Sequence, residues 1–198
     1  MKLYYSINSP YARKCRVVVF ETKLENRIKW QLVDPHQNPP ELLAANPLGK
    51  VPTLVTGSGN ALCDSTVICE YLDNESQCGL YPAGKERFKA LALAAIADGM
   101  TDMAVELILQ KRRPKDQQWP DWIAKREQGI IRAAAVVEKQ MEGRETPLNI
   151  GHITLACALA YVDFRHPEVA WRNANPRLAD WVDAFKQRPS MQATLPAA

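Results

Sequence analysis

The chain has little of what marks a nucleic-acid-binding or membrane protein. Its 198 residues carry 25 basic and 22 acidic side chains, and the resulting net charge of +3 is too small to argue for nucleic acid or an anionic membrane. No apolar run approaches the roughly 20 residues that a membrane-spanning helix needs. Residues 1–5 enter a strand-like pattern and lack the apolar core of a signal peptide. We therefore expect a cytoplasmic protein with no nucleic-acid or membrane partner.

Patterns for metal binding and for disulfide frameworks are also absent. The five cysteines include no Cys-x-x-Cys, and this odd set predicts reduced, mostly buried thiols. The three histidines, His36, His152 and His166, show no ligand spacing among themselves or with the cysteines, so we expect no metal site. What is present, 46% apolar and 24% charged residues, is typical of a soluble globular protein with a proper core.

The first 77 residues alternate short strands with short helices. Ser9 is a preferred N-cap and Pro10 fits a first helical turn, which predicts a helix over about 11–22 with Arg13, Lys14 and Arg16 on its solvated face. Strands over 2–6 and 30–33 make this a βαβ unit with a parallel strand pair. Two further strands, 51–55 and 61–63, flank a Gly-rich turn typical of an antiparallel hairpin, and a helix follows over 65–74. This βαβ-ββα order is the thioredoxin-like arrangement.

Long helical patterns replace the strands in the second half. Residues 78–85, with glycines and a proline, are expected to form a linker. Helices are predicted over about 88–113, over 121–141 with Gly143 ending it, over 149–165, and over 176–187. The sequence therefore predicts an α/β thioredoxin-like domain at 1–77 and an all-α helical bundle at 86–198.

The segment Asn-Pro-Leu-Gly-Lys-Val-Pro-Thr-Leu-Val, residues 46–55, puts a proline inside a strand pattern. Because proline cannot donate a ladder hydrogen bond, Val51-Pro52 must be a sheet edge, a bulge or a special turn. A cis bond there would cost only about 0.5–1 kcal/mol. It would direct the backbone N–H and C=O of Val51 outward, where they could pair with an extended peptide.

A second motif, Asp64-Ser65-Thr66-Val67-Ile68, follows at the start of a helix. The two motifs at this spacing resemble the glutathione-binding half of the glutathione S-transferase superfamily. The two-domain plan and the phrase from Asn175 to Ser190 extend the resemblance over the whole chain. The resemblance implies a cis Val51–Pro52 bond, pairing of Val51 with the cysteinyl part of glutathione, and binding of the γ-glutamyl end by Asp64 and Ser65.

Other glutathione contacts are expected from charge and loop position. Lys50 could reach the glycine carboxylate as a flexible point charge. Gln37, or His36 beside it, lies in the loop where the family often contacts the same carboxylate. The resemblance makes Ser9 the expected hydrogen-bond donor to the thiolate, with Tyr5 and Ser6 as rivals.

Two departures from related patterns are present. Ser9-Pro10-Tyr11-Ala12 resembles the Cys-Pro-Tyr-Cys of glutaredoxins and the Cys-Pro-Phe-Ala of omega-class transferases, but serine replaces the reactive cysteine. This argues against an omega-like thiol transferase. The family commonly opens the later helix with a Ser/Thr cap and an Asp three residues on, whereas here the pair is Asn149 and His152, so that carboxylate is missing.

The leading hypothesis is a homodimeric glutathione transferase that activates glutathione, its co-substrate, for attack on a small hydrophobic electrophile or a peroxide. The second substrate is expected against Tyr11, Met100, Met103 and Arg112. A non-catalytic glutathione-binding interaction or stress module, a glutathione-dependent disulfide reductase and a maleyl-type isomerase remain alternatives.

Overall fold

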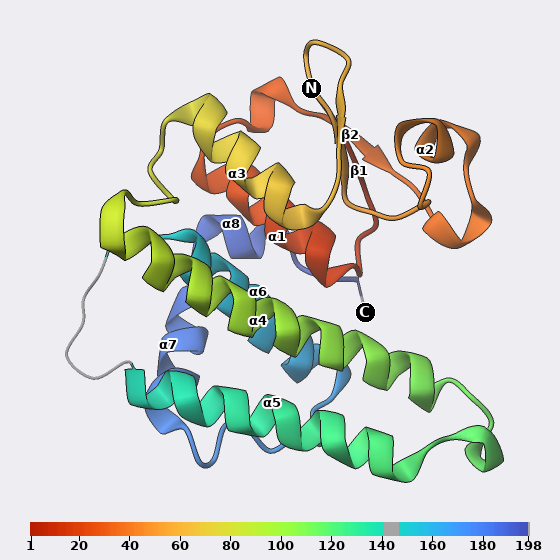
Figure 1. Ribbon diagram of the computed structural model, residues 1–198, viewed down its shortest axis with the longest axis vertical. Helices are drawn as coiled ribbons and strands as arrows, with labels where there is room; N and C mark the ends of the chain where they lie inside the picture. The colour runs from red at the N-terminus through yellow and green to blue at the C-terminus, as the bar shows by residue number, and fades with distance from the viewer. Residues whose placement is uncertain (141–146, 198) are drawn as a thin grey trace. The chain divides into compact units, whose positions relative to one another are not determined.

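The computed structural model describes residues 1–140 and 147–197, and its chain divides into two compact units (Figure 1). The first unit holds Met1–Tyr81 together with Arg188–Ala198, and the second holds Pro82–Gln187. The sequence-based ranges differ at the C-terminus, because they place residues 188–198 with the helical half. The contacts that draw this last segment to the first unit are described below.

A four-stranded sheet forms the centre of the first unit, in the order β2-β1-β3-β4. Its strands are β1 (Lys2–Tyr5), β2 (Lys29–Leu32), β3 (Thr53–Val55) and β4 (Ala61–Leu62). β1 and β2 are parallel, while β3 is antiparallel to both β1 and β4. This is the expected thioredoxin-like order of a βαβ unit followed by a hairpin and a helix.

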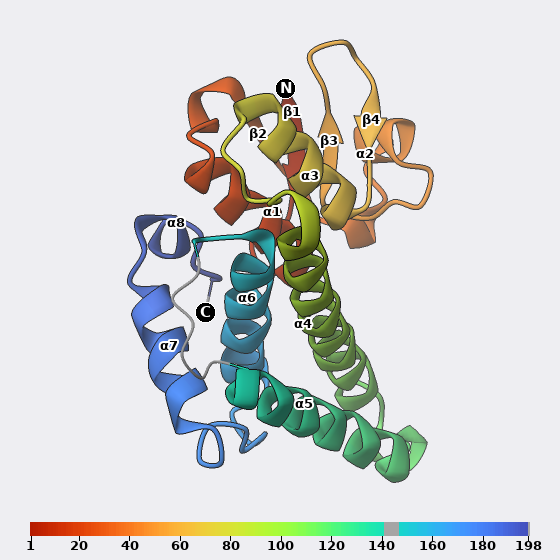
Figure 2. The same ribbon diagram turned by 60° about the vertical axis from the view of Figure 1, so that its left-hand side comes forward.

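Three helices cover the two faces of this sheet. α1 (Pro10–Glu21) and α3 (Ser65–Ser76) pack against each other on one face, and α2 (Pro40–Ala45) lies on the other (Figures 1 and 2). Leu3 and Tyr4, neighbours on β1, are both buried because each points into one of these two layers. On the α2 side, Leu42 packs with Tyr4 and Val33 in a small apolar cluster.

The basic residues of α1 correct one expectation. Arg13 and Lys14 are only 5% and 3% exposed, so they do not form a solvated face. For Arg13 the cause is the short helix α8 (Pro189–Gln192), which packs against α1 and lets Arg13 Nη2 donate to the carbonyl of Met191 (3.3 Å). The sequence around α1 could not predict this burial, because Met191 lies 178 residues after Arg13 in the chain.

An ion pair fastens the same C-terminal segment to the end of α1. The carboxylate of Glu21 accepts two hydrogen bonds of 2.8 Å from the guanidinium of Arg188 and one from the hydroxyl of Ser190. Such a bidentate arginine pair fixes orientation as well as charge. These contacts explain why the chain returns to the first unit at Arg188.

The second unit contains four long helices, α4 (Gly84–Lys111), α5 (Pro120–Gln140), α6 (Ile150–Arg165) and α7 (Pro176–Lys186). α6 is buried along most of its length and packs against α4 and α7 (Figure 2). Its apolar residues share a core with the fully buried Trp171. The expected end of α5 at Met141, with the stop at Gly143, falls outside the described residues.

Asn149 caps α6 as expected, because its side-chain oxygen accepts from the backbone N–H of Gly151 (3.0 Å) and His152 (3.3 Å). A buried carboxylate does cap a helix start in the second unit, but the helix is α7 and the carboxylate comes from α5. Glu138 of α5 accepts from the backbone N–H of Leu178 (2.7 Å) and from Arg177 Nε (2.9 Å) in the first turn of α7. Burial alone would raise the pKa of Glu138, but these hydrogen bonds outweigh it and lower that pKa.

We expect Glu138→Gln to lower the free energy of unfolding by about 1.5–3 kcal/mol at pH 7, since charge-assisted hydrogen bonds to a buried carboxylate are lost. A carboxyl whose folded pKa is lowered stabilises above its unfolded pKa of about 4.3, and this stabilisation disappears as pH falls through the lowered value. The difference between the two proteins should therefore shrink at acid pH. Urea unfolding at several pH values measures it.

The matched control is Glu86→Gln, because Glu86 lies on the exposed surface of α4 and, among the described residues, forms its ion pair with Lys89, one turn away. The free energy of unfolding of this variant should stay within about 0.5 kcal/mol of that of the parent protein. Equal effects of the two substitutions at neutral pH would contradict the role assigned to Glu138.

Candidate functional site

The candidate site lies at one edge of the sheet in the first unit. Leu54 of β3 stands opposite Leu62 of β4, so the antiparallel register, continued by two residues, sets Pro52 opposite Asp64. β1 runs antiparallel to β3 and ends at Tyr5 on the same edge. The end of β1, the start of β3 and the end of β4 therefore meet there, and α1 and α3 begin just beyond β1 and β4.

The Val51–Pro52 bond is cis, as the resemblance implied, and a second cis bond joins Cys63 to Asp64. Of the three options that the proline left open, the structure has the special turn, because β3 begins only at Thr53. Within residues 1–140 and 147–197, neither the N–H nor the C=O of Val51 has a hydrogen-bond partner. Val51 thus offers a free donor and a free acceptor.

A buried network, which the sequence analysis missed, holds this turn in place. Asn46 and Thr53 are 1% and 0% exposed, and Asn46 Nδ2 donates to Lys50 O (3.1 Å) and to Thr53 Oγ1 (3.0 Å). Thr53 Oγ1 donates in turn to Lys50 O (2.8 Å), and Asn46 Oδ1 accepts from the N–H of Leu48 (3.0 Å). The available signal was the pair Asn46 and Thr53, two uncharged polar residues that flank the predicted turn.

The glycine of this turn is required by its backbone. Gly49 has φ +62°, and a Cβ there would meet Leu43 Cδ2 at 3.2 Å and Asn38 Oδ1 at 3.6 Å. The loop after β2, which carries His36 and Gln37, therefore runs beside the turn that leads to Lys50.

Asp64 stands at the N-cap of α3. Its Oδ1 accepts from the N–H of Thr66 (2.7 Å) and from the hydroxyl of Ser65 (3.3 Å), while Oδ2 bonds to no residue that the structure describes. Because Ser65 Oγ is already a donor to Asp64, its hydroxyl proton is not available to a ligand in this arrangement. The N–H groups of Ser65 and Val67 take no acceptor among the described residues, so the start of α3 can bind an anion.

Ser9 occupies the N-cap of α1, and its Oγ accepts from the N–H of Ala12 (3.2 Å). A serine hydroxyl holds one donor proton besides its acceptor lone pairs. The described part of the chain provides no acceptor for that proton. Ser9 can therefore cap the helix and donate to a bound anion at the same time.

The rivals of Ser9 are engaged differently. The ring of Tyr5 packs edge-on against Trp30, with centroids 5.9 Å apart, and the guanidinium of Arg16 lies 4.9 Å from its centroid. The carbonyl of Ser6 accepts from the N–H of Ser9 at 3.4 Å. Neither residue stands at a helix start.

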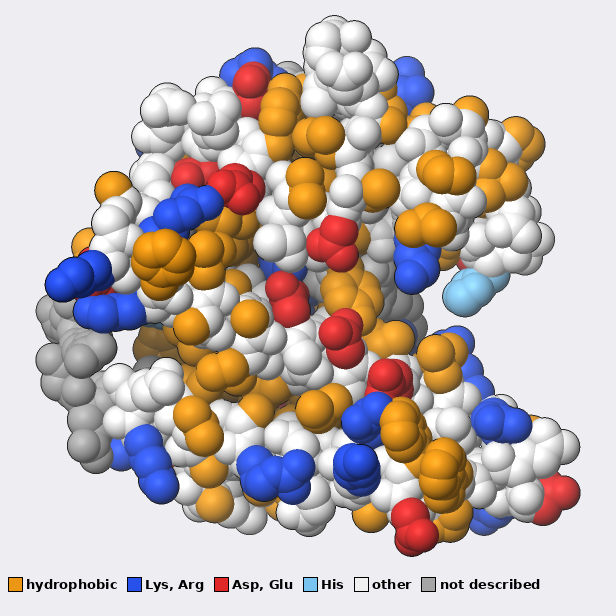
Figure 3. Space-filling view, in the orientation of Figure 1, with side chains coloured by type: hydrophobic (Ala, Val, Ile, Leu, Met, Phe, Trp, Pro, Cys, Tyr) orange, Lys and Arg blue, Asp and Glu red, His pale blue; other side chains and the backbone are white. Residues whose placement is uncertain are grey.

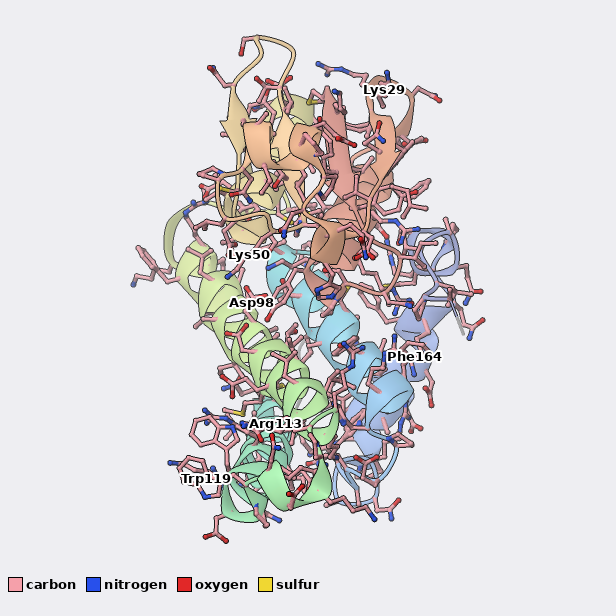
Figure 4. All side chains as sticks on the ribbon, turned by 90° about the vertical axis from the view of Figure 1, so that its right-hand side faces the viewer. Lys29, Lys50, Asp98, Arg113, Trp119 and Phe164 are labelled. Atoms are coloured by element: carbon pink, nitrogen blue, oxygen red, sulfur yellow. The ribbon has the colours of Figure 1, made fainter. Side chains whose placement is uncertain are left out.

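The residues expected to contact the glycine carboxylate lie on the surface of the first unit. Lys50 is exposed (Figure 4), and its ammonium forms no ion pair with any described carboxylate. His36 and Gln37 are exposed in the 3-10 turn η2 (Pro35–Gln37), which the side chain of Asp34 caps. These side chains are free to adjust to a ligand.

The buried cysteines are not candidates for a catalytic nucleophile. Cys15 is fully buried, burial raises its pKa, and its Sγ lies 3.5 Å from Ser65 O and 3.7 Å from Cys69 Sγ. Cys157 is also buried, so three of the five thiols are, in line with the expectation of mostly buried thiols. Cys63 and Cys78 are exposed.

The predicted second-substrate residues need one correction. Met100 is 1% exposed within the core of the second unit, so it is a packing residue and not part of a pocket. Met103 packs against α5, where a Cβ at Gly129 would collide with its sulfur. Arg112, at the C-cap of α4, is exposed, and Tyr11 is half-buried in the first turn of α1. Helical spacing alone did not distinguish the core face of α4 from its other faces.

Metal clusters and membrane spans are both absent from residues 1–140 and 147–197. No group of three His, Cys, Asp or Glu side chains in this part of the chain has the arrangement of a metal site. None of the helices among these residues combines the length and apolar character needed to cross a bilayer.

Comparison with known proteins gives the family. Residues 8–75 match the glutathione S-transferase N-terminal domain and residues 120–184 the C-terminal domain. The uncharacterized GST-like protein YibF of Escherichia coli K12 is 30% identical over 203 residues, covering 99% of this chain and 98% of that protein.

Two solved structures are similar over their whole length. One is a glutathione transferase family member from Pseudomonas fluorescens Pf-5 with bound S-(propanoic acid)-glutathione, with 38% identity, 100% of both chains covered and a TM-score of 0.91. The other is a glutathione S-transferase from Methylobacillus flagellatus KT with bound glutathione, with 34% identity, 99% of both chains covered and a TM-score of 0.88. The chain therefore belongs to the glutathione S-transferase superfamily.

Proposed function

We propose that the protein is a glutathione transferase that binds glutathione at the sheet edge of its first unit. The observation that carries this proposal is the unpaired backbone of Val51 next to the starts of α1 and α3. An extended tripeptide can pair with a free N–H and C=O as a strand does. The glutathione-bound relatives from Pseudomonas fluorescens and Methylobacillus flagellatus support the choice of tripeptide.

Each part of glutathione has a counterpart in the site. Asp64 Oδ2 would accept from the γ-glutamyl ammonium, and the free N–H groups at the start of α3 would bind the carboxylate beside it. Val51, with Pro52 after it, would pair with the cysteinyl backbone. Lys50, with Gln37, would meet the glycine carboxylate at the exposed rim.

Ser9 would stabilise the thiolate. A free thiol has a pKa near 8.5, and donors at a helix start lower it by one to several units. Donation from the Ser9 hydroxyl, together with the N-terminus of α1, favours the thiolate, whose proton leaves to solvent. The sulfur lone pair then forms a bond to an electrophilic carbon or to a peroxide oxygen, and the leaving group departs with the bonding electrons.

Further parts of the proposal come from the family and from composition. We infer a cytoplasmic homodimer that acts on a small hydrophobic electrophile, with Tyr11 and Arg112 as the remaining candidate contacts for that substrate. We also propose that residues 1–77 and 86–198 are the functional domains, joined by 78–85.

A calorimetric titration of the full-length protein with glutathione tests the proposal. We expect saturable binding, with a Kd on the order of 0.1–1 mM or tighter, and turnover of a general electrophile by the same preparation. The absence of binding at millimolar glutathione would contradict the proposal. Normal binding without turnover on a broad electrophile panel would instead favour a non-catalytic glutathione-binding module.

A further inference from the structure

A groove on the second unit lies outside the candidate site described above. It runs between the end of α4 and the start of α5 and has a volume of about 300 Å³. Its lining is Glu106, Leu109, Gln110, Trp119 and Trp122. All of these residues belong to Pro82–Gln187, so the groove does not depend on the glutathione site. Its volume suits a small organic ligand.

The apolar part of the groove is an aromatic platform. Trp119 and Trp122 stack with their centroids 5.6 Å apart and their planes at 21°, although Trp119 remains 59% exposed. Figure 3 shows hydrophobic side chains gathered next to basic ones over this part of the second unit, and Figure 4 labels Trp119 there. The turn that carries Trp119 is held by Gln118 Nε2, which donates to the carbonyls of Lys111 (3.3 Å) and Arg113 (3.0 Å).

Two polar side chains, Gln110 and Glu106, line the groove beside the indoles. The side-chain oxygen Oε1 of Gln110 is buried and has no hydrogen-bond partner among the described residues. Glu106 accepts from Arg126 through Oε2, and its Oε1 bonds to no described residue. The free oxygen of Glu106 can therefore accept a hydrogen bond from an N–H group of a ligand.

A row of acidic side chains on α4 leads to the groove. Glu106 continues a row with Asp98 and Asp102 at four-residue spacing on α4, and Figure 3 shows acidic side chains following that helix. The indole faces attract cations, as they already do for Arg126, whose guanidinium lies 3.6 Å from the centroid of Trp122. Arg112, Arg113 and Lys115 lie on the neighbouring turn but do not line the groove.

From these contacts we propose that the α4–α5 groove binds a small organic ammonium ion with an aromatic or alkyl body. The body stacks on Trp119, and the ammonium donates to Glu106 Oε1, the oxygen that bonds to no described residue. The flat indole walls and the negative charge of Glu106 match this chemistry and disfavour the corresponding carboxylate.

The probe is 2-phenylethylammonium, which is charged at pH 7 because primary alkylamines have a pKa near that of lysine, about 10. Its control is 3-phenylpropanoate, which has the same ring and chain but the opposite charge. An NMR titration of the full-length protein reads the indole N–H signals and gives both Kd values. We expect the amine to bind at least about tenfold more tightly than the acid, with shifts confined to two indole signals.

Two variants and one control sharpen the test. Trp119→Ala should weaken amine binding about three- to tenfold, since an exposed stacking face is lost. Phe88→Ala, which removes an exposed aromatic from the other end of α4, should leave it unchanged. Glu106→Gln leaves the charge of Arg126 uncompensated and should reverse the preference, so that the acid binds more tightly than the amine.

Three outcomes would overturn the proposal. One is the absence of saturable amine binding up to about 20 mM, an affinity too weak to mark a site. Another is equal or tighter binding of 3-phenylpropanoate by the unmodified protein. The third is a change of oligomeric state on Trp119→Ala with no effect on amine binding, which would assign the groove to a second copy of the chain.

Discussion

Ser9→Ala should lower kcat/KM for glutathione and a general electrophile about 100-fold, which corresponds to about 2.7 kcal/mol of transition-state stabilisation. The reason is that the hydroxyl proton of Ser9 has no acceptor among the described residues and stands at the start of α1, where a bound sulfur anion would accept it. Without it the thiol pKa rises. The pH profile of kcat/KM should therefore shift to higher pH, and a steady-state pH series measures both effects.

Ser9→Thr is the matched control, because threonine keeps both the cap to Ala12 and a hydroxyl donor. It should recover most of the activity at an unchanged pH profile. Loss of the cap in Ser9→Ala costs about 0.5–2 kcal/mol of stability, which thermal unfolding reports separately. If the alanine variant kept full kcat/KM, the thiolate role would pass to another hydroxyl, with Tyr5 the first to test.

Asp64→Asn should weaken glutathione binding about 10- to 100-fold. The amide still caps α3, because asparagine is among the best N-caps, so the fold should lose no more than about 0.5 kcal/mol. What it removes is the charge on Oδ2, the oxygen that has no partner among the described residues. Calorimetry with each protein gives the ratio of Kd values.

Removing the ammonium from the ligand tests the proposed contact between Asp64 and the γ-glutamyl ammonium separately. N-acetylglutathione lacks the ammonium, so the parent protein and the Asp64→Asn variant should bind it with similar, weak affinity, as a double-mutant cycle requires when the pair is removed from either side. A full loss of affinity for N-acetylglutathione on substitution would show that Asp64 acts through the fold of the α3 start and not through the ammonium.

Features set by neighbouring residues could be predicted from the sequence. Ser9-Pro10 at one helix start and Asp64 at another follow from backbone preferences that act within a few residues. At Val51-Pro52 these preferences only excluded an ordinary central strand, and the family resemblance implied the cis turn. The parallel β1–β2 pair and the β3–β4 hairpin followed from connection lengths and turn residues in the same way. These local features also define most of the candidate site.

Features that depend on distant segments could not be predicted. The burial of Arg13 depends on α8, and the core position of Met100 depends on the packing of α4 against the other helices of its unit. Glu138 meets the start of α7 from 40 residues away. The periodicity of a sequence predicts which face of a helix is apolar, but it does not predict which segment packs against that face. The sequence alone therefore could not predict these contacts.

A crystal structure of the protein with glutathione tests the account most directly. The account predicts that the N–H and C=O of Val51 pair with the cysteinyl residue, and that the sulfur lies within about 3.2–3.5 Å of Ser9 Oγ. Glutathione bound with its sulfur against Tyr5, or bound away from residues 51–52, would contradict it.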